Sequence, residues 1–217
     1  MPFFRDNITS VLSEMSIAHG GEFDFGDITK IFNERYFKLF QARKHILFTK
    51  EIKLKDNSIY NISVETDGIH ILVLNKEDDD SLMAAIEIRA RLLKQNLSKL
   101  YHNVISIKSV KVLDKYKNKG LMKKVYLGLL DLGYSIMGDG VEYESARGLW
   151  VSLQGFQNFK TDILDIDNDK VLYKDIKLKD INDKRVWLYV DPDELRQREY
   201  SFKERYWVWV RLIMYKK

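Results

Sequence analysis

The stretch Val104–Leu132, VISIKSVKVLDKYKNKGLMKKVYLGLLDL, decides the fold that we expect for this chain of 217 residues. Its first nine residues alternate in polarity, which is typical of a strand with one buried face. A lysine-rich loop follows, and apolar residues then recur at helical spacing from Leu121 to Leu132. Gly133 stands where a helix commonly ends. The sequence therefore predicts a unit of strand, basic loop and helix.

The residues before this unit predict an antiparallel meander. Segments that alternate in polarity or are rich in β-branched residues are separated by turn residues such as Asp56–Ser58 and Asp67-Gly68. The expected strands are Ile46–Leu54, Tyr60–Glu65, Ile69–Leu74 and Ser81–Ile88. The apolar period becomes helical again over Arg89–Leu100, so we expect a helix between the meander and the strand at Val104.

The N-terminal residues are expected to form helices outside the main domain. The second of these helices carries an aromatic face made of Phe32, Tyr36, Leu39 and Phe40. Such a face needs a surface to bury against, either on this chain's sheet or on another subunit, which makes a homo-oligomer a candidate. We predict residues 1–42 as a helical appendage and residues 43–217 as the main domain.

The residues after the helix predict a mixed α/β fold. Tyr134–Met137 reads as a short buried strand, and a further helix carries the apolar face Tyr143, Ala146, Leu149, Trp150 and Leu153. Further strands are expected at Val171–Leu178, Val186–Val190 and Tyr206–Tyr215, with a turn over Asp162–Asp169 and another turn opening a short helix at Asp191–Leu195. The order of elements is typical of a central sheet with flanking helices, that is, of an α/β or α+β domain.

Composition excludes several classes of protein. The chain has no cysteine, which excludes disulfides, thiolate metal sites and a cysteine nucleophile and fits a cytoplasmic location. The N-terminus does not resemble a signal peptide, and no apolar run is long enough for a membrane helix. The four histidines show no metal-binding spacing, so we predict no metal. A net charge of +4 is compatible with a phosphate-bearing ligand or a nucleic acid.

The basic loop is the feature that points to chemistry. A loop that leaves a strand and opens a helix presents free N–H groups at the positive end of the helix dipole. Lys115, Lys117 and Lys119 add positive charge, and Gly120 allows a ligand to approach the backbone. A pyrophosphate suits such a site. The alternative interpretation is a solvated basic turn before an ordinary helix.

The loop and its surroundings resemble the acetyl-CoA-binding core of the GNAT superfamily of N-acetyltransferases. That core carries a strand, then Arg/Gln-x-x-Gly-x-Gly/Ala, then a helix, and here the motif position reads Lys117-Asn118-Lys119-Gly120-Leu121-Met122. Downstream, the helix Ala146–Gln154 followed by Gly155-Phe156 is similar to the family's second helix and its Gly-Phe. The closest resemblance covers residues 104–156. The Lys-, Asn- and Ile-rich composition, together with this core, is similar to that of GNAT-like proteins of bacteriophages.

The sequence also departs from the family pattern. Lys117 replaces the usual Arg or Gln, and Met122 replaces a small residue. Trp150 stands where many members carry the tyrosine that is proposed to protonate the departing thiolate, and an indole N–H is only a donor. Tyr143 replaces an asparagine of the second helix, and Ser106 faces the place where some members carry a glutamate base.

The resemblance implies a set of site residues. The pantetheine of acetyl-CoA would lie between the strands Ser106–Val112 and Tyr134–Met137, where a backbone N–H polarises the thioester. The residues implied in cofactor binding are Val110, Lys111, Val112, Lys117, Asn118, Lys119, Gly120, Leu121, Met122 and Trp150. The candidates for proton transfer are His102, Glu142 and Tyr143.

Two functions are therefore carried forward. The first is an acetyl-CoA-dependent N-acyltransferase that acts on an amine of a small molecule, a protein or a modified nucleobase. The second is a catalytically silent GNAT-like module that binds a protein or a nucleic acid. The basic loop favours the enzyme, whereas Trp150 and the N-terminal helices favour the module.

Overall fold

A computed structural model describes residues 42–78, 80–90, 93–138, 142–156, 158–178, 187–188 and 210–217. The chain divides into a unit of Met1–Ala42 and a unit of Arg43–Lys217, and the second unit is the subject here. The helices expected in the first forty residues and the turn expected at Asp191–Leu195 lie outside the described residues. Across the described residues, no helix is long and apolar enough to cross a membrane.

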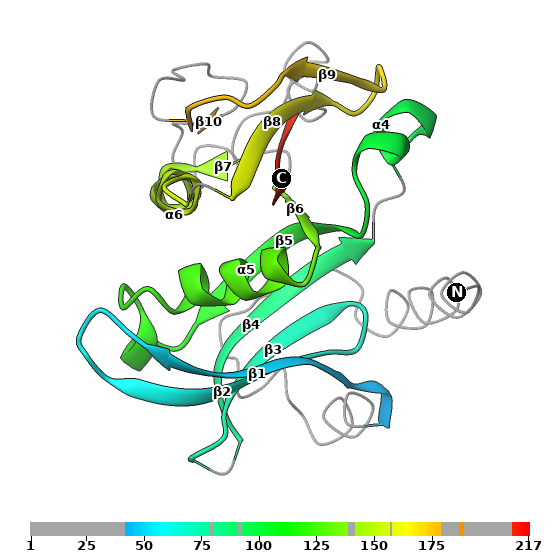
Figure 1. The fold of residues 1–217 in the computed structure, drawn as a ribbon. Helices are drawn as coiled ribbons and strands as arrows, with labels where there is room; N and C mark the ends of the chain where they lie inside the picture. Colours follow the sequence, from blue (N-terminus) through cyan, green and yellow to red (C-terminus); the bar gives the residue numbers. More distant parts are fainter. Residues whose placement is uncertain are drawn as a thin grey trace, which may run out of the picture. The chain divides into compact units, whose positions relative to one another are not determined.

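The second unit is a mixed α/β structure with a large, mostly antiparallel sheet and few described helices (Figure 1). The strands before the basic loop are β1 (His45–Lys53), β2 (Ile59–Thr66), β3 (His70–Asn75), β4 (Ser81–Ala90) and β5 (Val104–Val112). Those after it are β6 (Ser135–Met137), β7 (Glu142–Tyr143), β8 (Phe159–Asp165), β9 (Lys170–Tyr173), β10 (Trp187–Leu188) and β11 (Val210–Lys216). The helices are α4 (Gln95–Leu100), η1 (Asp114–Tyr116), α5 (Leu121–Asp131) and α6 (Glu144–Gln154).

Nine strands form one sheet in the order β1-β2-β3-β4-β5-β6-β11-β8-β9, and β10 pairs with β7 in a second, parallel pair. Within the nine-stranded sheet every neighbouring pair is antiparallel except β5 and β6. A parallel pair needs a crossover connection, and α5 supplies it. The helix therefore lies over the sheet between the two strands that it connects in sequence (Figure 1).

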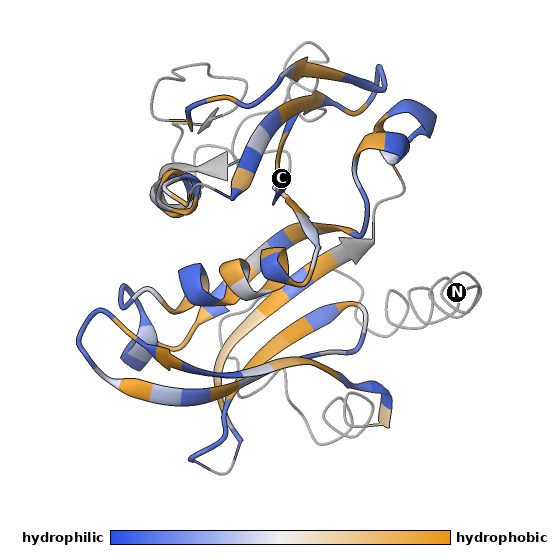
Figure 2. Cartoon of the chain, viewed as in Figure 1, coloured by the Kyte–Doolittle hydropathy of each residue, from blue (hydrophilic) through white to orange (hydrophobic). Residues whose placement is uncertain are grey.

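The predicted meander and the predicted strand–loop–helix unit are confirmed. β5 has the expected bounds, and α5 ends one residue before the predicted end. Hydrophobic residues dominate β3 and β4, and the turn between β1 and β2 is hydrophilic (Figure 2). The helix expected over Arg89–Leu100 is shorter, because β4 continues to Ala90 and α4 begins only at Gln95.

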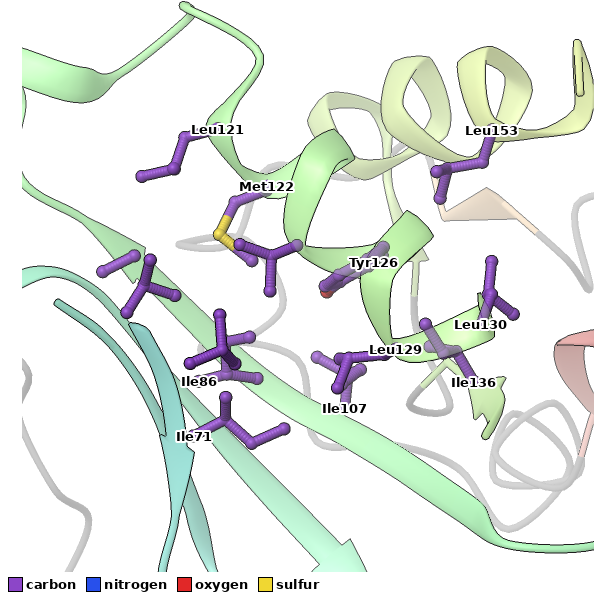
Figure 3. Close-up of a cluster of buried hydrophobic side chains, with 14 of the residues drawn as sticks. Ile71, Ile86, Ile107, Leu121, Met122, Tyr126, Leu129, Leu130, Ile136 and Leu153 are labelled. Atoms are coloured by element: carbon purple, nitrogen blue, oxygen red, sulfur yellow. The ribbon is translucent and has the colours of Figure 1, made fainter. Parts of the chain in front are cut away.

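The main core lies between one face of the sheet and the helices α5 and α6. Helix α5 buries its apolar side chains, and each contributes roughly 1.5–3 kcal/mol relative to exposure in water. These residues are Leu121, Met122, Val125, Tyr126, Leu129 and Leu130. Figure 3 shows Met122 and Leu129 on the side of α5 that faces Ile86 and Ile107 of the sheet, and Leu130 beside Ile136 and Leu153.

A smaller core lies on the other face of the sheet, under α4. Successive strand residues point to opposite faces, so Met137, Leu164 and Ile213 belong to this cluster while Ile136, Ile163 and Leu212 belong to the main core. The cluster also includes Leu97 of α4 and Tyr101, the residue directly after that helix.

A buried carboxylate in β8 connects three segments of the chain across this smaller core. Asp162 is 1% exposed and accepts hydrogen bonds from the hydroxyl groups of Tyr101 at 2.6 Å and Tyr215 at 3.0 Å, and from the N–H of Asp175 at 2.8 Å. Burial and the charge of Asp162 raise the pKa of Tyr215 to about 12, so the hydroxyl stays protonated. These contacts satisfy a carboxylate that would otherwise be costly to bury.

The expected turn at Asp162–Asp169 is wrong in its first half. β8 runs to Asp165, and only the residues from Ile166 onward form the turn into β9. Two aspartates in a short segment favour a turn, but burial and hydrogen bonds to distant tyrosines override that local preference. The expected strand Val171–Leu178 is also shorter, because β9 ends at Tyr173.

The edge strand β1 packs directly on α5 at Gly128. A Cβ atom at this position would lie 2.8 and 2.9 Å from the Cε1 and Cε2 atoms of the Phe48 ring, closer than side chains normally approach. A glycine inside a helix ordinarily costs about 1 kcal/mol relative to alanine. Here it is the absence of a side chain that lets β1 approach the helix.

We predict that Gly128→Ala and Phe48→Ala are strongly coupled. In the wild-type background the new methyl group must displace Phe48, and overpacking costs typically about 1–3 kcal/mol, which offsets the helix-propensity gain of about 1 kcal/mol. In the Phe48→Ala background only the propensity gain remains, so Gly128→Ala should stabilise. Chemical denaturation of the four proteins measures the coupling, and additive effects would contradict the contact.

Candidate functional site

The central strand β5 contains a β-bulge. Glu87 of β4 pairs with Ser109, but the next residue, Ile88, pairs with Ile107, so Lys108 is the extra residue. The Nζ atom of Lys108 lies 2.6 Å from a carboxylate oxygen of Glu87. A bulge increases the local twist and bends the strand. It lies just after the point where β5 stops pairing with β6.

β5 and β6 are paired over only three positions. The register runs from Val104 with Ser135 to Ser106 with Met137. β6 then ends, and the N–H of Gly138 donates to the carbonyl of Leu212 in β11 at 2.9 Å. The rest of β5, residues 107–112, therefore pairs only with β4 among the described strands.

The unpaired side of β5 presents backbone donors. The N–H of Leu113 donates to the carbonyl of Met83 at 3.0 Å. Met83 precedes Ala84, the β4 residue that pairs with Val112. Because backbone direction alternates along a strand, the N–H groups of Val110 and Val112 point the other way, toward the side that β6 has left. Val110 is 40% exposed. The residues from which the sequence analysis expected a polarising N–H thus carry donors on the open side of the strand.

The basic loop ends at an uncapped helix. η1 turns the chain, and Gly120 occupies the N-cap position of α5 with a left-handed φ of 85°, which favours glycine. No side chain caps α5, and its first internal bond runs from the N–H of Lys124 to the carbonyl of Gly120. The N–H groups of Leu121, Met122 and Lys123 have no acceptor inside the helix. Leu121 and Met122 are buried, so toward a ligand they offer backbone groups alone.

Each lysine of the loop is next to a carboxylate. The Nζ atoms lie 3.8 Å from Asp78 for Lys115, 2.6 Å from Asp114 for Lys117 and 2.8 Å from Asp56 for Lys119. The sequence analysis counted the lysines and missed these partners, so the loop carries less net positive charge than expected. All three ion pairs are open to solvent, where such pairs are weak, so a phosphate group can compete for the lysines.

One of these carboxylates comes from the turn between β1 and β2. Hydrogen bonds from Lys119 and Ser58 lower the pKa of the Asp56 carboxyl group to about 2. The N–H of Lys55 donates to the carbonyl of Lys119 at 3.0 Å. The Lys55 side chain also lies over Gly120, where an added Cβ would be 3.5 Å from its Cγ and Cε atoms. The turn therefore contributes a fourth lysine to the loop.

No local signal in the sequence could have found Lys55 and Asp56. They lie about sixty residues before the motif, in a turn with an ordinary polar composition. Only the pairing of β1 with β2 and the packing of β1 on α5 bring them to the loop.

The other candidate residues are spread over the domain. Trp150 is 3% exposed, and its ring centroid lies 6.4 Å from that of Tyr126 in the main core. His102 is exposed and precedes β5, at the end of the strand opposite the basic loop. A strand of nine residues spans about 30 Å, so the fold separates His102 from the loop. Glu142 and Tyr143 form β7, directly before α6.

No metal site emerges from the described residues, which contain no group of three or more His, Asp and Glu side chains that could hold an ion. Comparison with protein-family models, with curated proteins and with solved structures finds no match. Functional argument therefore depends on the geometry of the site.

We predict that the Lys119→Gln substitution raises the pKa of Asp56 from about 2 toward the ordinary value of 3.8. The Asp56 pKa is lowered in the folded protein, so its contribution to stability is present above pH 3.8 and is lost as the pH falls toward 2. The stability difference between wild type and Lys119→Gln should narrow over that window. A ¹³C NMR titration of the carboxyl group measures the pKa.

Lys117→Gln is the matched control, because it removes the partner that lowers the pKa of Asp114 and leaves Asp56 untouched. A wild-type Asp56 that titrates near 3.8 would show that the turn does not hold Lys119.

Proposed function

We propose that this protein is an acetyl-CoA-dependent N-acyltransferase of the GNAT type. The observation that carries the proposal is the coincidence of three features in one place. A bulged strand parts from its parallel neighbour after three pairs, donors face the open side, and the strand leads into a lysine-bearing loop at an uncapped helix N-terminus. The resemblance of the sequence implies this combination.

The sheet order also supports the GNAT-like interpretation of the fold. An antiparallel meander leads to the central strand, one parallel crossover follows, and antiparallel strands close the other side. The splayed parallel pair at the centre is the feature that the family uses to admit the pantetheine. The sheet is larger than the motif requires, because β9 extends one edge.

The described residues suit the parts of acetyl-CoA unequally. The N–H groups of Leu121, Met122 and Lys123 suit a pyrophosphate. Lys117 and Lys119 would exchange their exposed carboxylate partners for phosphate oxygens. The N–H of Val110 suits the thioester oxygen, where it would stabilise negative charge as the carbonyl carbon becomes tetrahedral.

Acetyl-CoA supplies the acetyl thioester when it is bound, and transfer to an amine forms an amide and releases a thiol. The chain must orient the neutral amine, accept or pass on its proton, and provide a proton for the sulfur. Tyr143, the last residue of β7, and Ser145 of α6 are our candidates for the donor that protonates the thiolate sulfur. Trp150 is excluded from that role, because its indole N–H does not exchange protons at neutral pH.

The silent module remains the second candidate because of two observations. Trp150 is part of the core rather than of an open site, and His102 is at the far end of β5 from the loop. Such a module would keep the fold and bind a protein or a nucleic acid partner without turnover.

We predict that the purified protein binds CoA and acetyl-CoA in calorimetric titration. Changing both Lys117 and Lys119 to Glu should weaken binding by at least about tenfold, because charge-assisted contacts of roughly 1.5–3 kcal/mol each become repulsive. Lys99→Glu combined with Lys174→Glu is the control, since it makes the same change in net charge at exposed positions elsewhere. Absence of wild-type binding would refute the proposal.

Trp150→Tyr separates the enzyme from the module. The substitution should lower the free energy of unfolding by about 1–3 kcal/mol, because it shortens a buried side chain. In an active enzyme, acetyl-CoA consumption with a panel of amines should stay unchanged or rise, because the new hydroxyl can protonate the thiolate. Trp150→Phe is the control without a hydroxyl. A wild type without turnover on any amine would favour the module.

A further inference from the structure

A groove of about 460 Å³ lies beside α5. Its first wall is β1, from Lys50 to Lys53, and its second wall is made by Phe156, Asn158 and Phe159. Lys124, Leu127 and Asp131 of α5 lie between these walls. The volume is within the range of about 300–1,000 Å³ that is usual for ligand sites.

The β1 wall is an open sheet edge. β1 is the first strand of the sheet and pairs only with β2 among the described strands. The N–H of Leu54 donates to the carbonyl of Ser58 at 2.9 Å, on the β2 side. Because direction alternates along a strand, Lys50 and Ile52 also face β2, whereas the N–H and C=O groups of Glu51 and Lys53 face outward. These outward groups can pair with an added strand.

The groove has a net positive charge that the protein itself does not neutralise. Lys50, Lys53 and Lys124 form no ion pair with any described residue, in contrast to the lysines of the basic loop. Asp131 lies 3.6 Å from Lys216, which offsets its charge. Glu51 is then the one lining carboxylate without a cation partner in the described chain.

Apolar side chains also line the groove, so it can bind apolar groups as well as charged ones. Ile52 and Phe159 are nearly buried, and Leu127 lies between them on α5. Phe156 is 40% exposed, and the Nζ atom of Lys123 lies 4.9 Å from its ring centroid. An apolar side chain that enters the groove from an edge-bound strand would therefore meet apolar partners.

We propose that this groove binds an extended acidic peptide segment of a partner protein, which adds to β1 as a further strand. The outward groups of Glu51 and Lys53 provide the main-chain pairing. Carboxylates on the α5 side of the added strand face Lys50 and Lys124, and those on its other side face Lys53, because side chains alternate between the two faces of a sheet. A second copy of this chain suits the groove less well, because it would bring its own three lysines to the same place. The inference does not rest on acyl transfer, since Lys50, Lys53 and Lys124 are not residues of the candidate site.

The first test is fluorescence anisotropy with a labelled peptide of alternating glutamate and valine at low ionic strength. Wild type should bind it, and Lys50→Glu combined with Lys53→Glu should weaken binding by about tenfold or more. Lys99→Glu with Lys174→Glu should bind like wild type, and so should Lys117→Glu with Lys119→Glu. A lysine–valine peptide should not bind. Failure of the acidic peptide to bind would overturn the proposal.

The second test needs no variant and reports on strand addition itself. Hydrogen exchange followed by NMR should show the amides of Glu51 and Lys53 becoming protected by about tenfold or more when the peptide is added. The amides of Lys50 and Ile52 already bond to β2 and should change little. A peptide N-methylated on alternate residues, on the edge facing β1, should lose binding.

Three outcomes would overturn the proposal in this second test. Equal binding of the N-methylated peptide, or displacement of the peptide by inorganic pyrophosphate at a similar concentration, would identify a plain anion site. Protection of Glu51 and Lys53 that grows with protein concentration in the absence of peptide would identify a second copy as the occupant.

Discussion

The parallel pairing of β5 with β6, the one such pairing within the nine-stranded sheet, is the constraint on which the rest of this structure depends. Antiparallel neighbours can be joined by tight turns, but two parallel strands require a connection that returns to the same end of the sheet. That connection is the basic loop and α5. Because α5 must lie over the sheet to complete the crossover, its apolar side chains and those of β3, β4 and β5 form the main core. The loop is thereby held at the end of β5 where the strand has lost its parallel partner.

The same crossover explains why the basic loop is less positive than its sequence. β1 packs on α5 through the contact between Gly128 and Phe48. This packing places the turn after β1, which contains Lys55 and Asp56, beside the basic loop. Asp56 then pairs with Lys119, while Asp114 pairs with Lys117 within the loop. The sequence of the loop suggests a free anion site, whereas in the structure each of its three lysines is paired with a carboxylate. Exposed pairs of this kind are weak, so they would lower the affinity of the proposed site for a phosphate without excluding that ligand.

Among the described residues, positive charge is left without an ion-pair partner at the open edge of β1. Lysines on an edge strand protect a sheet from pairing with neutral strands, and this protection by itself is a sufficient reason for Lys50 and Lys53. That protection does not account for Lys124 of α5 or for the apolar groove beside it. The edge can therefore be selective as well as protected, because the charge that repels most strands attracts an acidic one.

The sequence by itself determined the meander, the alternation of β5, the start of α5 and the glycine at its N-cap, because these features depend on residues close together in the chain. The resemblance of the sequence to the GNAT core implied a polarising N–H near Val110–Val112. The strand β8 escaped detection, because Asp162 is stable in a strand only with Tyr101 and Tyr215 as partners. The tertiary structure alone decided the bulge at Lys108, the early end of β6 and the carboxylate partners of Lys115 and Lys119. Each of these depends on contacts between residues far apart in sequence, for which local pattern carries no information.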